Sequence, residues 1–159
     1  MSLKGGFMSD NLNEIHLSLA KKCFNSTWEF LDKNDLTTAE EMEMLKFAHA
    51  SRYHWSFIGG PKHFAIGDWQ ISRAYAKINE GSLALKYAQN CLETTLENKV
   101  ESGYLSAYEG IARAYAVVQD YENAKEFILK AEQELEKVTD KEDREIYEPQ
   151  IKETKAMIK

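Results

Sequence analysis

Cysteine, proline and glycine are scarce in this chain, which has two, two and eight of them among 159 residues. Cys23 and Cys91 stand alone, without the paired spacing of a zinc knuckle or a redox motif. We therefore expect two reduced core thiols in an intracellular protein, with no disulfide. Because breakers are few and no Val, Ile or Thr runs alternate with polar residues, the pattern favours helices over strands.

Long apolar runs are also lacking. No stretch approaches the ~20 apolar residues that span a bilayer, and the start, MSLKGGFMSD, has no signal-peptide core. We expect a cytoplasmic protein that does not bind membranes. The second methionine, Met8, marks residues 1–7 as an expected expression remnant and residues 8–159 as one domain.

The net charge of -6 opposes binding to a nucleic-acid backbone. The charge is unevenly spread, because residues 44–92 hold six basic and two acidic side chains and sum to +4. An electropositive surface there would favour an acidic partner. Ordinary solvated helix faces explain the same composition equally well.

Turn and cap residues divide the chain into about seven helical segments. Thr37 and Glu40 have the spacing of a capping box, and Gly59 opens a Gly-Gly-Pro turn. Asp120 and Asp140 are expected to cap the last two segments, and Pro149 should kink or restart the final one. The segments that we expect are 10–31, 37–58, 62–79, 83–97, a fifth ending near 119, 121–137 and one that follows Asp140.

An internal repeat is visible in the second half of the chain. SRAYA at residues 72–76 returns as ARAYA at 112–116, and the same offset pairs Ala84 with Ala124 and Cys91 with Ala131. Small residues thus recur where one helix must approach another closely. The repeating unit is a helical hairpin.

These residues resemble the tetratricopeptide repeat family. In the copy at 105–138, Tyr108, Ile111, Ala112 and Tyr115 stand at the family's aromatic, aliphatic and small positions. The copy at 65–98 places Trp69 one residue late, neither copy has the closing proline, and residues 99–104 are an insertion. The resemblance implies an all-α fold of antiparallel hairpins, stacked as a right-handed superhelix or as an irregular bundle. Residues 139–159 would form a capping helix, and HASRYHW also resembles short bacterial proteins of this kind.

The resemblance also implies that the first helix of each hairpin lines a concave groove. The predicted partner-binding residues are Trp69, Arg73, Lys77, Glu109 and Arg113. Trp69, Arg73 and Lys77 are four residues apart and share one helix face, which suits a carboxylate next to an apolar side chain. The alternative is that Trp69 is a core residue and that both cations merely cover the helix surface.

The segment HASRYHW offers a second candidate site, a ligand pocket of His49, Arg52, Tyr53, His54 and Trp55. His49 and His54 are about 140° apart around a helix, so they do not suit one metal ion, and we predict no metal site. Histidines that are hydrogen-bonded within an aromatic wall are the alternative.

No nucleophile motif, phosphate loop or HExxH motif occurs, so we predict no catalytic residue and no cofactor. The first hypothesis is a non-enzymatic interaction module that binds a peptide or a partner protein in the concave groove. An acidic partner is one form of this hypothesis. The second is a small-molecule binder or minor hydrolase that uses His49, Tyr53 and His54. Self-association as a homodimer is also left open.

Overall fold

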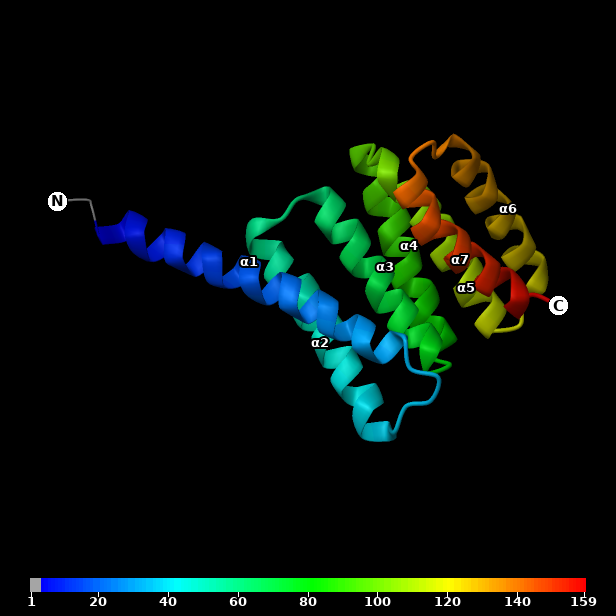
Figure 1. Cartoon of the computed structure of the whole chain (residues 1–159), viewed down its shortest axis with the longest axis horizontal. Coiled ribbons are helices and arrows are strands. Elements are labelled where there is room, and N and C mark those ends of the chain that lie inside the picture. Colours follow the sequence, from blue (N-terminus) through cyan, green and yellow to red (C-terminus); the bar gives the residue numbers. More distant parts are fainter. Residues whose placement is uncertain (1–3) are drawn as a thin grey trace.

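The computed structural model describes residues 4–159, and side chains from Ser9 onward. Within this range the chain forms seven α-helices, one short 3-10 turn and no strand (Figure 1), which confirms the all-α prediction. Residues 1–3 of the expected remnant lie outside the described residues, and Lys4 begins the first helix. The elements are α1 (Lys4–Leu31), α2 (Thr38–Ile58), α3 (Pro61–Lys77), α4 (Gly81–Asn98), η1 (Glu101–Gly103), α5 (Tyr104–Val117), α6 (Tyr121–Lys137) and α7 (Lys141–Met157).

Consecutive helices pair as hairpins, α1 with α2, α3 with α4 and α5 with α6. The hairpins are stacked in chain order, because α2 packs on α3 and α4 packs on α5. The last helix, α7, packs on α5 and α6, and the N-terminal part of α1 extends away from the rest of the chain (Figure 1). None of the helices in the described range is apolar over enough length to cross a membrane.

The helix ends follow the local sequence. Glu40 donates its backbone N–H to the Thr37 hydroxyl at 3.3 Å, and its carboxylate accepts the Thr37 N–H at 2.9 Å, which completes the predicted capping box. Pro61 occupies the first turn of α3, and the carboxylates of Asp120 and Asp140 cap α6 and α7. Helix α7 continues through Pro149, so the predicted restart of the helix does not occur.

The turns of the second and third hairpins have the same geometry at equivalent repeat positions. Asn79 and Gln119 adopt left-handed conformations with φ of 61° and 63°. The next N–H in each turn, of Glu80 or Asp120, donates to the carbonyl five residues earlier at 2.9 or 3.0 Å. These paired bonds satisfy the last carbonyls of α3 and α5. The repeat seen in the sequence therefore has a counterpart in backbone geometry.

Small residues occupy the places where helices cross. Ala74, Ala84, Ala112 and Ala124 are fully buried, and the Ser72 hydroxyl donates to the Ala84 carbonyl at 2.7 Å. Side chains of this size let neighbouring helices approach closely and fill the space without voids. The larger core residues, such as Ile71, then lie between hairpins. The first helices of the pairs are neighbours, because α1 contacts α3 and α3 contacts α5.

Candidate functional site

A cleft lies on the side of the molecule formed by α1, α3, α5 and α7. Three cavities, of about 220, 260 and 340 Å³, share Ile66 in their lining, and we call them together the Ile66 cleft. Helix α1 contributes Phe24 and α7 contributes Tyr147. The other residues used below are Lys21, Trp28, Lys62, His63, Trp69, Ser102, Ser106, Asp143, Ile146 and Gln150.

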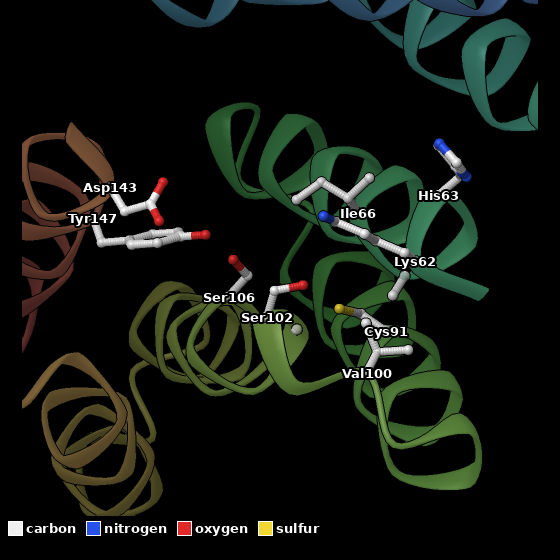
Figure 2. A pocket seen from close by; sticks show the side chains of 11 residues that line it. Lys62, His63, Ile66, Cys91, Val100, Ser102, Ser106, Asp143 and Tyr147 are labelled. Carbon is white, nitrogen blue, oxygen red and sulfur yellow. The ribbon is translucent and has the colours of Figure 1, made fainter. Parts of the chain in front are cut away.

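Figure 2 shows the first of these cavities from close by. Asp143 and Tyr147 of α7 face Ser102 and Ser106 across it, whereas Lys62 and Ile66 come from α3 on the opposite side. The wall is mainly apolar, and hydroxyls and one charge of each sign lie at its rim. Such a surface can bury an apolar side chain and still hydrogen-bond its surroundings.

Cys91 also lines this cavity, but as an inert thiol. Burial raises the pKa of Cys91 to about 12, with Asp68 contributing in the same direction. At neutral pH the sulfur is therefore protonated, and it is the thiolate that reacts. The prediction of a core thiol fits this environment.

A buried charge network lies next to the cleft, centred on Glu109 of α5. This carboxylate is 0 % exposed and accepts hydrogen bonds from three helices. Trp69 donates its indole N–H at 3.0 Å, Thr154 donates its hydroxyl at 2.6 Å, and Arg113 donates Nε and Nη2 at 2.9 and 2.7 Å. Glu109 thus ties α3, α5 and α7 together.

Arg73 and Arg113 also share a second carboxylate, that of Glu153 on α7. Arg73 Nη2 donates to Glu153 Oε2 at 2.7 Å, and Arg113 Nη1 lies 3.4 Å from Glu153 Oε1. Burial opposes ionisation of both glutamates, but the two guanidiniums outweigh it and hold the pKa of Glu109 and of Glu153 below the ordinary value. Both carboxylates are therefore charged at neutral pH.

The predicted groove residues lie together, though not as exposed as we expected. Arg73, Lys77 and Arg113 line a cavity of about 180 Å³ at the C-terminal ends of α3 and α5. Lys77 also donates to the Lys33 carbonyl. Of the two interpretations of Trp69, groove residue or core residue, the structure fits the second, because Trp69 is 3 % exposed and Glu109 holds its N–H in the interior. Glu109, also predicted to bind a partner, is 0 % exposed and cannot meet one directly.

The HASRYHW segment does not form one pocket. Its residues make separate contacts that join α2 to its neighbours, and none of the cavities described above is lined by His49, Tyr53 or His54. Tyr53 is 62 % exposed. The other contacts are His49 Nε2 with the Tyr75 hydroxyl at 3.0 Å, Arg52 Nε with Asp68 Oδ1 at 3.1 Å, His54 Nδ1 with His16 Nδ1 at 2.8 Å, and Trp55 stacked on His63.

Through these contacts the segment connects α2 to α1 and α3. The alternative drawn from the sequence, hydrogen-bonded histidines within aromatic surroundings, describes His49 and His54 in their observed positions. Across residues 4–159, no group of three or more His, Cys, Asp or Glu side chains is arranged to hold a metal ion.

The histidine contacts predict a pH-dependent stability. Burial lowers the pKa of His49 and of His54 from 6.5, and the neighbouring His16 lowers that of His54 further. The unfolded chain therefore takes up protons first, so the free energy of unfolding should fall as pH drops from about 7 to about 5. Urea unfolding at several pH values measures this fall. The decrease should shrink in a His49→Gln, His54→Gln variant, and an equally steep decrease there would exclude these two histidines as its cause.

Several residues of the site were not predicted from the sequence. Phe24 and Trp28 of α1 are four residues apart and so share a helix face, a signal that was available. Glu153 and Thr154 of α7 gave no signal, because they lie in a highly charged segment whose apolar stripe indicated only a cap. Their roles depend on the long-range contact with Glu109, 45 residues from Thr154.

The chain was also compared with known proteins. No protein-family model, curated protein or solved structure matches the chain. The cleft and the charge network are therefore the basis for assigning a function.

Proposed function

We propose that this chain is a non-enzymatic protein-interaction module. In this proposal its hairpins are tetratricopeptide-like repeats, and a peptide segment of a partner protein binds in the Ile66 cleft. The observation that carries the proposal is the meeting of three cavities at Ile66, between the first helices of successive hairpins and α7. Stacked hairpins commonly leave such a surface for partners.

The chemistry of the cleft suggests which segment would bind. Phe24, Trp28, Ile66 and Tyr147 are partly buried, and each would lose further apolar surface to a bound aliphatic or aromatic side chain. Burial of this kind contributes roughly 25 cal/mol per Å². The exposed cations Lys21 on α1 and Lys62 on α3 outnumber the one exposed carboxylate at the rim, Asp143 on α7, which favours acidic residues on the α1–α3 side of the cleft.

One buried polar atom fits recognition of a peptide backbone. The amide oxygen of Gln150, in the wall of the cleft, is buried and has no hydrogen-bond partner among the described residues. A buried acceptor without a partner is costly, and a backbone N–H of the bound segment would satisfy it.

The polar groups that line the cleft are compatible with a binding role. Neither Ser102 nor Ser106 is hydrogen-bonded to a histidine or carboxylate within residues 9–159, and His63 points away from them (Figure 2). Nucleophilic catalysis requires such a base within hydrogen-bond reach. These observations support binding rather than hydrolysis.

Selection of peptides from a random display library tests the proposal. Peptides enriched on the wild-type chain should carry an apolar anchor and bind Ile66→Glu at least about 100-fold more weakly, because a carboxylate would be buried against the anchor. Ile66→Ala should weaken binding by about tenfold through lost contact area.

The matched control is Leu129→Glu on α6, where Leu129 is 57 % exposed and does not line the cleft. This variant should bind the selected peptides like the wild type. Equal binding by Ile66→Glu, with its thermal unfolding unchanged, would place the binding surface elsewhere.

A further inference from the structure

The cavity at the C-terminal ends of α3 and α5 has the features of an anion site. Its volume is about 180 Å³, and its charged lining consists of Arg73, Lys77, Arg113 and Glu153. Leu31 and Met157 supply apolar walls. Three cations face two carboxylates, Glu153 at the edge and the buried Glu109 behind the arginines, so one positive charge remains in excess when Glu153 is in place.

The two arginines are held in position before any partner arrives. Their side chains are only 10 % and 6 % exposed, and Arg113 is fixed by its two hydrogen bonds to Glu109. Arg73 packs over the rings of Trp28 and Trp69, with its guanidinium carbon 5.4 and 5.6 Å from the ring centroids. A rigid pair of guanidiniums binds a carboxylate at a smaller entropic cost than two mobile side chains would.

Arg73 also has an unused donor. Its Nη1 is buried, has no hydrogen-bond partner within the described chain, and lies 3.8 Å from Glu109 Oε1. A buried guanidinium nitrogen without an acceptor is unfavourable, and a second carboxylate oxygen would correct this.

The Glu153 carboxylate, which now pairs with Arg73 and Arg113, can leave the two arginines. Its side chain is 57 % exposed, unlike that of Glu109, which is 0 % exposed. Glu153 itself stays in contact with water, although both arginines are largely buried, so its carboxylate loses less hydration in the ion pair than a buried partner would. The Glu153 side chain can therefore rotate into solvent while Ile151 and Thr154 keep α7 buried on α5.

We propose that the Arg73–Arg113 cavity is a carboxylate-binding site and that Glu153 is its internal ligand, which an acidic side chain of the partner segment replaces. This inference rests on the proposed function for the identity of the partner, because the segment must reach the cavity from the Ile66 cleft. Trp28 and Trp69 form a continuous wall between the two.

The geometry gives the spacing of the partner's residues. Seven residues of helix separate Ile66 from Arg73, a distance of about 10 Å. An extended peptide covers this distance in about three residues. The acidic residue should therefore lie three or four positions from the apolar anchor of the bound segment.

A titration with N-acetyl-glutamate N-methylamide, which carries one side-chain carboxylate, tests the site without any peptide partner. The probe should shift the Nε–H NMR signals of Arg73 and Arg113, and the matching glutamine derivative should not. In Glu153→Gln the affinity should rise by about two- to fivefold, the range expected when a competing half-exposed ion pair is removed. The matched control is Glu132→Gln. It removes a different ion pair of α7, the one in which Lys155 lies 2.6 Å from Glu132 of α6, and it should leave the affinity unchanged.

The outcomes separate this inference from the proposed function. If the arginine signals do not respond, or if Glu153→Gln binds the probe no better than the wild type, the proposal of a carboxylate site is wrong. The proposal that peptides bind in the Ile66 cleft would still stand. If the site binds the probe but selected peptides show no acidic residue three or four positions from their anchor, its link to the cleft is wrong.

Discussion

Replacement of Glu109 by alanine is expected to lower the free energy of unfolding by about 3–5 kcal/mol. The substitution leaves two guanidiniums, 6 % and 10 % exposed, without their buried counter-charge. It also removes the acceptor for the Trp69 indole and the Thr154 hydroxyl. Equilibrium unfolding in urea measures the loss, and an unchanged slope against denaturant would show that both folded states are equally compact.

Two further variants identify the cause of this loss. Glu109→Gln keeps most of the side-chain volume but not the charge, so we expect it to lose nearly as much stability as the alanine variant. Glu132→Gln removes a carboxylate from an ion pair whose two side chains are 54 % and 32 % exposed, and should change stability by less than about 0.5 kcal/mol. If the glutamine variant at position 109 were as stable as the wild type, the buried charge network would not hold the helices together.

Replacement of Trp69 by alanine should have a comparable effect, a loss of about 3–5 kcal/mol. Trp69 packs in a core cluster with Cys91 and Ala107, and its ring lies 5.9 Å from that of Trp28. Removal of the indole leaves a cavity between α3 and α5 and deprives Glu109 of one donor. Thermal unfolding followed by circular dichroism measures the effect as a lower Tm.

Trp69→Phe distinguishes packing from hydrogen bonding. It retains much of the ring volume but lacks the N–H, so it should lose only about 1–3 kcal/mol. The losses from Trp69→Ala and Glu109→Ala should not add in the double variant, because the two side chains share one contact. Full additivity would mean that the indole and the carboxylate stabilise the fold independently.

The helices could be predicted from the sequence because their signals are local. Thr37 with Glu40, Pro61, Asp120 and Asp140 act within one turn of their own helix. The internal repeat likewise depends on small residues at fixed spacing, and the turns at Asn79 and Gln119 have the same geometry. Pro149 is the exception in part, because α7 runs through it and the restart that was one of the two expected outcomes does not occur.

The site was predicted less well, because its character depends on contacts between distant segments. Helical spacing correctly placed Trp69, Arg73 and Lys77 on one side of α3. Spacing could not show that Glu109, on a different helix from Trp69, would take up the indole N–H, or that Glu153 of α7 would reach Arg73. In HASRYHW, the concentration of histidines and aromatics suggested a pocket, whereas the side chains contact separate partners, His16 on α1 and Asp68 and Tyr75 on α3.

The most direct test of the Ile66 cleft as the binding surface is NMR mapping of a display-selected peptide on the isotope-labelled chain. Our account predicts that the largest shift changes occur at Phe24, Ile66, Ser106 and Tyr147, one residue from each of α1, α3, α5 and α7. Changes concentrated instead around the exposed Leu83 and Leu129, on α4 and α6, would contradict it.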